Sequence, residues 1–127
     1  MMEEKGKFYE CEDCKSIVEL VEGEESSIKC CGGKLKEIKP NTSEGAGEKH
    51  IPDVEIQGNV ATVKVGSILH PMLAEHYIGW IAMYTNKGVY RKELEVGKEP
   101  TAKFLLSEGE EISAVYAYCN EHGLWKK

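Results

Sequence analysis

At 127 residues, of which 41% are hydrophobic and 30% charged, the chain has the composition of a folded globular protein and not of a disordered one. Its net charge of -6 argues against nucleic acid as a main partner, because phosphate binding needs a concentrated basic surface. No apolar run approaches the roughly 20 residues of a membrane span, and the Met1–Lys5 start lacks the apolar stretch of a secretory signal, so we expect a cytoplasmic protein without membrane attachment.

Residues 1–39 hold four of the five cysteines and little apolar sequence. These four cysteines are Cys11, Cys14, Cys30 and Cys31. A short apolar patch, Ile17–Val21, and a turn signal at residues 22–24 predict two short strands joined by that turn. A module this small has too little apolar surface to fold alone, so we expect a bound metal to stabilise it.

Residues 40–47 are turn-rich and nearly free of large apolar side chains, which is typical of a linker or a mobile loop. After residue 50 the hydrophobic period is two, as in the alternation over residues 61–65, while residues 77–84 are apolar on both faces like a central strand. Further strands are predicted, with turn signals between them, at residues 89–96, 102–106 and 112–119. No helix of useful length is evident. The pattern predicts an all-β protein in which residues 40–127 form an immunoglobulin-like β-sandwich behind the metal-stabilised domain of residues 1–39.

The first candidate site is the cysteine set of residues 1–39. The Cys11-x-x-Cys14 spacing lets two thiolates face one ion across a tight turn. A second pair, Cys30 and Cys31, follows 15 residues later and can complete the ligand set. Neighbouring side chains diverge, so binding both members of this pair should distort a tetrahedron. A reducing compartment favours metal ligation over disulfides, and structural zinc, iron and a vicinal disulfide remain the alternatives.

The second candidate site combines the remaining cysteine with all four histidines of the chain. Its members are His50, His70, His76, Cys119 and His122. Cys119 and His122 follow a predicted strand. Pro71 keeps the segment from His70 to His76 from forming a regular helix, so we expect loop positions at the ends of strands.

The number of ligands in this second set bears on the choice of metal. Five protein ligands exceed the closed four-coordinate shell of structural zinc and indicate a redox iron with one position open. Type-1 copper is an alternative, because it too uses a C-x-x-H-like loop on a β-sandwich. That site would want a methionine just after its last histidine, where Leu124 and Trp125 stand instead. A zinc-stabilised binding module is a further alternative.

The whole chain resembles desulfoferrodoxin, the two-iron form of superoxide reductase. The cysteine set of residues 1–39 looks like the desulforedoxin-type centre of that family. Four motifs look like its catalytic centre, namely Glu48-Lys49-His50, His70-Pro71-Met72, His76 and Cys119-Asn120-x-His122-Gly123.

The resemblance implies two irons per chain, an Fe(Cys)4 centre in residues 1–39 and an Fe(His)4Cys centre in residues 40–127. The four imidazoles would be equatorial ligands of a square-pyramidal ferrous ion, with His122 bound through Nδ1 and the other three through Nε2. Cys119 would be the axial thiolate. Backbone N–H groups of Asn120, Glu121 and His122 could moderate the electron donation by its sulfur.

The activity that the resemblance implies is the reduction of superoxide to hydrogen peroxide without production of dioxygen. Lys49 would draw in the anion, and Glu48 would bind the oxidised iron once product has left. An ordinary solvated lysine and a surface carboxylate are the competing interpretations of these two residues. The family further implies a rubredoxin-like electron donor and a homodimer. An electron-transfer protein, in which both irons only carry charge, is the alternative function.

Overall fold

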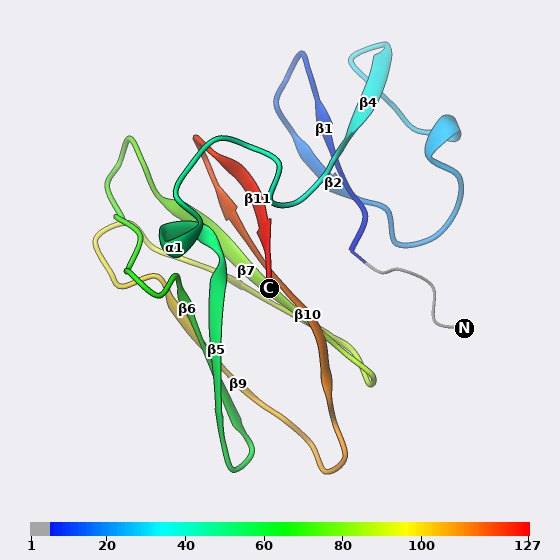
Figure 1. Ribbon diagram of the computed structural model, residues 1–127. Coiled ribbons are helices and arrows are strands. Elements are labelled where there is room, and N and C mark those ends of the chain that lie inside the picture. Colours follow the sequence, from blue (N-terminus) through cyan, green and yellow to red (C-terminus); the bar gives the residue numbers. More distant parts are fainter. Residues whose placement is uncertain (1–5) are drawn as a thin grey trace. The chain divides into compact units, whose positions relative to one another are not determined.

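The computed structural model describes residues 6–127, apart from the side chain of Lys34. The Met1–Lys5 start, on which the expectation of no secretory signal rests, lies outside the described residues. The chain divides into two compact units, Met1–Lys39 and Pro40–Lys127. Nearly all regular structure is antiparallel β (Figure 1), which confirms the predicted all-β class. Between residues 6 and 127, no helix is both long and apolar enough to cross a membrane.

The first unit is one four-stranded antiparallel sheet with the strand order β2-β1-β4-β3. Its strands are β1 (Phe8–Cys11), β2 (Ile17–Glu19), β3 (Lys29–Cys30) and β4 (Gly33–Ile38). The prediction of two strands joined by a turn at residues 22–24 is wrong, because a 3-10 helix, η1 (Glu25–Ser27), follows that turn and β2 and β3 lie at opposite edges of the sheet. Strand pairs form instead across the two turns that carry cysteines.

The Tyr9 hydroxyl ties η1 to the sheet. It donates to Oε2 of Glu25 at 2.6 Å, and this bond, together with burial, raises the pKa of Tyr9 to about 12. The side chains of Phe8, Tyr9 and Cys11, all on the same strand, are buried. Strand β1 is therefore the central element around which the cysteine-bearing turns of the first unit are arranged.

The second unit is a β-sandwich of two antiparallel sheets (Figure 1). The three-stranded sheet has the order β5-β6-β9 and contains β5 (Pro52–Gln57), β6 (Val60–Val65) and β9 (Thr101–Leu105). The four-stranded sheet has the order β11-β10-β7-β8 and contains β7 (Ile78–Thr85), β8 (Val89–Glu93), β10 (Ile112–Cys119) and β11 (Gly123–Lys126). Short helix α1 (Gly47–His50) precedes β5.

Five of the seven sandwich strands coincide with the predicted ones, and the two missed strands are edge strands. In β5 most side chains are exposed, so the strand lacks the alternation that marks a half-buried one. Strand β11 is only four residues long and begins at Gly123. Edge strands pair on one side only. Strand β5 is defined by its pairing with β6 and β11 by its pairing with β10, and the hydrophobic pattern of neither segment reveals this pairing.

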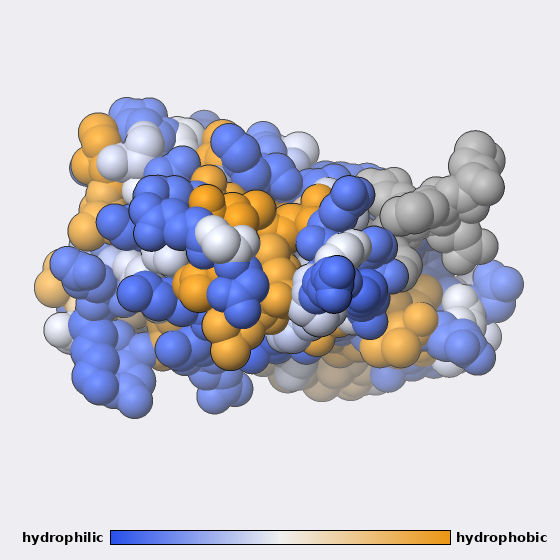
Figure 2. All heavy atoms as spheres, turned by 90° about the horizontal axis from the view of Figure 1, so that it is seen from below, coloured by the Kyte–Doolittle hydropathy of each residue, from blue (hydrophilic) through white to orange (hydrophobic). Residues whose placement is uncertain are grey.

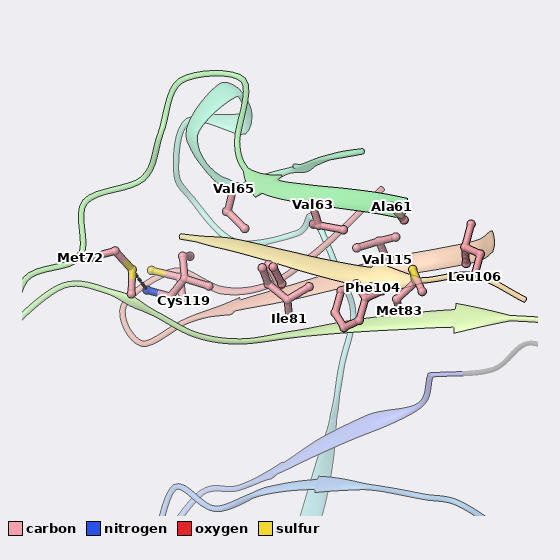
Figure 3. Packing of buried hydrophobic residues seen from close by; sticks show 13 residues of the cluster. Ala61, Val63, Val65, Met72, Ile81, Met83, Phe104, Leu106, Val115 and Cys119 are labelled. Atoms are coloured by element: carbon pink, nitrogen blue, oxygen red, sulfur yellow. Dashed lines mark hydrogen bonds between the residues drawn. The ribbon is translucent and has the colours of Figure 1, made fainter. Parts of the chain in front are cut away.

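The core lies between the two sheets, where alternate residues of the strands point inward (Figure 3). Ala61, Val63 and Val65 of β6 are completely buried, as their period of two predicts. Burial of each valine contributes roughly 1.5–3 kcal/mol. The same cluster includes Met72 and Cys119, so the core extends to the end of the sandwich where the second ligand set lies.

The surface carries apolar as well as polar side chains, and hydrophobic residues lie among hydrophilic ones on the face shown in Figure 2. Three exposed apolar residues come from the loop between β6 and β7, namely Ile68, Leu69 and Leu73. That loop also carries His70 and His76, so two of the candidate ligands lie beside apolar surface.

A buried carboxylate, Glu110, organises the loops around the β7–β8 hairpin. Glu110 accepts hydrogen bonds from the hydroxyl groups of Thr85 and Tyr90 and from the backbone N–H and hydroxyl of Ser107. The Thr85 hydroxyl has the largest effect on it, and together these donors lower the pKa of Glu110 to about 2. The turn at residues 86–88 joins β7 to β8, with Thr85 N donating to Gly88 O at 2.9 Å.

This carboxylate gives a pH prediction. Its pKa in the folded protein lies below its value in the unfolded chain, so its contribution to stability is present above the unfolded pKa and is lost as pH falls. We expect the parent to lose this contribution between about pH 5 and pH 2, and Glu110→Gln to show a weaker pH dependence there. Urea unfolding at pH 6 and pH 3 measures the unfolding free energy of the parent and of Glu110→Gln. Glu111→Gln, a change at the exposed neighbouring residue, is the control. Equal pH dependence in parent and Glu110→Gln would contradict the assignment.

Candidate metal centres

The four cysteines of the first unit meet at the two turns of its sheet. Their sulfur atoms all lie within 4.8 Å of one another. Sγ of Cys14 lies 3.3 Å from Sγ of Cys30, and Sγ of Cys30 lies 3.9 Å from Sγ of Cys31. All four are free thiols, so the structure does not contain the vicinal disulfide. The set has the number and type of ligands that a tetrathiolate iron or zinc site requires.

The backbone explains how two adjacent cysteines approach one centre. Cys31 has a φ of +56° and Gly32 a φ of +74°, so the chain enters the left-handed region directly after Cys30. For a non-glycine residue this conformation costs roughly 1–2 kcal/mol. It turns the Cys31 side chain back toward the other three, which the extended backbone of a continuing strand could not do.

The four histidines of the second unit form a closed square of imidazole rings. Neighbouring ring centroids lie 4.6 Å (His50–His70), 4.5 Å (His70–His76), 5.1 Å (His76–His122) and 4.8 Å (His122–His50) apart, with interplanar angles between 70° and 83°. The diagonal from His50 to His76 is 6.4 Å. Rings standing edge to face around a centre can direct one nitrogen each toward a single ion.

The Cys119 thiol approaches this square from the core. Cys119 is completely buried and belongs to the hydrophobic cluster. Its Sγ lies 3.5 Å from Nε2 of His70 and 3.8 Å from Nδ1 of His122. The ligand atoms of the five residues all lie within 4.8 Å of one another. One sulfur on the protein side of four imidazoles is the donor arrangement of a square pyramid.

Hydrogen bonds select the tautomers of two buried histidines. Nδ1 of His50 lies 2.8 Å from Ala46 O, and Nδ1 of His70 lies 2.7 Å from Pro71 O. A carbonyl oxygen only accepts, so each Nδ1 carries the proton and each Nε2 keeps a free lone pair. Burial lowers the pKa of His50 and lowers that of His70 to about 4, which keeps both rings neutral, as metal ligation requires.

His76 provides the strongest sign that the site suits an ion. Its Nε2 is buried and has no hydrogen-bond partner. A buried polar nitrogen without a partner costs about 1–3 kcal/mol, so native proteins seldom leave one in this state. A metal ion at the centre of the square would satisfy it. The donor set and this orphaned nitrogen therefore fit the iron that the sequence predicts.

The turn after Cys119 holds the sulfur and the neighbouring loop in place. The backbone N–H of His122 donates to Sγ of Cys119 at 3.4 Å and opposes the rise in the thiol's pKa that burial causes. Asn120 does not act on the sulfur as expected, because its N–H donates to Tyr77 O at 3.2 Å. Its side chain accepts from Tyr77 N and donates to Glu75 O. Asn120 thus joins the Cys119 turn to the segment that carries His76.

Two further residues, neither of them expected to take part in the site, lie against the square. Trp125 stacks on His50 at 4.7 Å between centroids and donates through Nε1 to His122 O at 3.1 Å. Gly45 lies in the stretch interpreted as a linker, yet a Cβ there would be 3.2 Å from His50 and 3.4 Å from His122. A glycine in a turn-rich segment was the available signal, but it did not indicate which surface that segment covers.

Glu48 and Lys49, the expected catalytic residues, precede His50 on α1 and are both exposed. The backbone of this turn is fixed to the β6–β7 loop, since Glu48 O accepts from Ile68 N at 2.9 Å and from the Ser67 hydroxyl at 3.2 Å. Both side chains therefore project from a firmly held backbone next to a buried candidate ligand.

Comparison with known proteins places these features in a family. The family model described as Desulfoferrodoxin matches residues 42–127. The chain is 42% identical over 125 residues to the desulfoferrodoxin homolog of Archaeoglobus fulgidus, with 98% of each chain covered. It is 38% identical over 120 residues to desulfoferrodoxin of Nitratidesulfovibrio vulgaris, with 94% of each covered. The crystal structure of the superoxide reductase from Treponema pallidum matches with a TM-score of 0.81 and 35% identity, covering 98% of this chain and 99% of that one.

The fold and the two ligand groups define a non-haem iron protein that combines a desulforedoxin-like four-cysteine module with an immunoglobulin-like sandwich. The chain belongs to the desulfoferrodoxin family. The resemblance stated from the sequence is thereby confirmed. A four-cysteine group and a group of four histidines and one cysteine are consistent with two irons per chain.

Proposed function

We propose that this protein is a superoxide reductase, in which superoxide takes up one electron and two protons to give hydrogen peroxide, without production of dioxygen. The observation that carries the proposal is the square of four imidazoles with a buried thiol on its core side. These five protein donors would hold an iron ion that could still bind a small anion. The Treponema pallidum structure, which bears the name superoxide reductase and matches nearly the whole chain, supports the same activity.

The proposed ligands of this iron are the five residues of the second set, His50, His70, His76, Cys119 and His122. An iron ion held there would supply the one-electron redox chemistry that the reduction of superoxide needs. The Cys119 thiolate donates electron density from the core side, and the His122 N–H on its sulfur moderates this donation. Lys49 provides a positive charge against an acidic background and draws the anion toward the site. Glu48 is proposed as a carboxylate that would bind the iron in its oxidised form.

The first unit is proposed to be a desulforedoxin-like Fe(Cys)4 domain of residues 1–39, and residues 40–127 to be the superoxide reductase domain. The four ligands of the first iron are Cys11, Cys14, Cys30 and Cys31. A rubredoxin-like electron donor and a homodimeric assembly belong to the same proposal and derive from the family resemblance. A cytoplasmic location is proposed because a reducing compartment preserves free thiol ligands.

A pure electron-transfer protein is the second candidate, and the four-cysteine set is the observation that favours it. Four thiolates close a tetrahedral shell and leave no position for a substrate. The two functions differ in one measurable property. A superoxide reductase reacts rapidly with superoxide in its reduced form, whereas a coordinatively saturated carrier does not.

Pulse radiolysis of the reduced protein across a salt series tests the proposed function and the role of Lys49 together. We expect a fast second-order reaction in the parent that slows as salt is added. Lys49→Ile should slow it and flatten the salt dependence, because a local charge steers an anion over roughly a Debye length, about 8–10 Å. Lys103→Ile, which removes the same charge from an exposed position on β9, is the control.

The outcomes are distinct. No rapid reaction in the iron-loaded parent would reject superoxide reduction and leave electron transfer as the function. A fast parent with the same rate and salt slope in Lys49→Ile would keep the activity and remove Lys49 from it. An equal decrease in the rate of reaction with superoxide in Lys49→Ile and Lys103→Ile would assign the effect to net charge alone.

A further inference from the structure

The four imidazoles differ in what faces the ring nitrogen that points away from the centre. For His50 and His70 that nitrogen is Nδ1, and its acceptor is a neutral backbone carbonyl, Ala46 O or Pro71 O. For His122 the inward nitrogen is Nδ1, which lies 3.1 Å from Nε2 of His50. Two histidines are therefore oriented by uncharged groups of the main chain.

His76 is different, because its outer nitrogen faces a carboxylate. Nδ1 of His76 lies 3.6 Å from Oε2 of Glu121, and the opposite nitrogen, Nε2, is the buried atom without a partner. A carboxylate accepts and does not donate, so it favours the tautomer with the proton on Nδ1 and the lone pair of Nε2 directed at the centre. The side chains are 23% and 53% exposed, respectively, so the contact lies at the rim of the site.

The position of Glu121 in the chain lets one charge act on two ligands. Glu121 lies in the turn between Cys119 and His122, so it is two residues from the thiol and directly precedes a histidine of the same set. A negative charge close to both an imidazole and a thiolate stabilises the more positive oxidation state of an ion that they share. Outer carboxylates on metal-bound histidines also increase the basicity of the ring.

We propose that Glu121 is a positioning residue that orients His76 toward the iron and lowers the reduction potential of the Fe(His)4Cys centre. The inference rests on the iron site of the proposed function and deepens it, since it assigns the tuning of that site to a side chain outside the ligand set. A contact between a carboxylate and a histidine at the solvent-exposed rim contributes little to folding stability, so the effect is expected in the redox equilibrium and not in the unfolding free energy.

The test is the midpoint potential of the Fe(His)4Cys centre, measured by spectroelectrochemistry on the full iron-loaded protein. Glu121→Gln keeps the shape of the side chain and removes its charge. Loss of an outer-shell partner typically costs about 10–100-fold in metal affinity. A tenfold change in the preference for ferric over ferrous iron, the lower limit of that range, corresponds to about 59 mV for one electron. The midpoint potential should therefore rise by about this amount in Glu121→Gln. The rise should shrink with added salt, because the carboxylate is half exposed.

The matched control is Glu75→Gln, which removes the same charge from an exposed residue next to His76 in sequence. Glu121→Asp, which retains the charge, should restore most of the potential. Equal rises in Glu121→Gln and Glu75→Gln, or no rise in Glu121→Gln with iron bound, would overturn the proposal. Failure of the proposed function is separate, because it would show in the parent as a missing reaction with superoxide, whatever the potentials of the variants are.

Discussion

Replacement of Cys119 by serine is expected to lower the rate of reaction with superoxide by more than about 100-fold, because the change removes a proposed direct ligand and outer-shell changes already cost about 10–100-fold. An alcohol is a far weaker electron donor than a thiolate. The loss of rate does not come from packing, since serine is slightly smaller than cysteine and fits the same buried site. The substitution also leaves a hydroxyl in the apolar cluster around Met72, so some loss of stability is expected.

The measurement is pulse radiolysis with iron content determined on the same sample, together with the visible spectrum of the oxidised form. The thiolate absorption of the Fe(His)4Cys centre should disappear in Cys119→Ser. Cys30→Ser is the control, because it removes a thiolate from the first ligand set, which shares no residue with the second set. Activity within a few-fold of the parent in an iron-loaded Cys119→Ser protein would reject the proposed role of Cys119 as a thiolate ligand of this iron.

Gly66→Ala is expected to disrupt the histidine site from a residue that contacts no ligand atom. A Cβ at Gly66 would lie 2.6 Å from Glu48 O, 2.9 Å from Ile51 O and 3.1 Å from the carbonyl carbon of Lys49. All three are backbone atoms, which cannot rotate aside. The turn that carries Glu48, Lys49 and His50 would have to move as a unit, at a cost of roughly 1–3 kcal/mol for overpacking.

We expect Gly66→Ala to lower both the thermal unfolding midpoint and the affinity of the second iron, the latter by about tenfold or more. Gly88→Ala is the control, because no heavy atom lies within 4 Å of a Cβ at that hairpin position. Iron titration, the ferric spectrum and thermal unfolding separate the two variants. A Gly66→Ala protein with the iron affinity and midpoint of the parent would show that the turn can shift without cost.

The members of the two candidate ligand sets and the class of the fold could be predicted from the sequence. Thiolates and imidazoles are few in this chain, and every one of them falls into one of two sets whose members come together. The inward strands of the sandwich, such as β6, carry a period of two because one face meets the core and the other meets water. Both signals are local, so they can be read without knowledge of which strands pair.

Features that depend on contacts between distant segments required the tertiary structure. The order of the imidazoles around the square follows from how three separate loops and turns pack together, and the pairing of β1 with β4 and the edge positions of β5 and β11 follow from strand order. Neither can be read from one segment alone. The same holds for the close approach of Gly66 to the Glu48 turn and for the carboxylate of Glu121 beside His76. The residue types of the site can be identified in the sequence. Its geometry, and the contacts that adjust the properties of its ligands, form only when loops that are distant in the chain pack against one another.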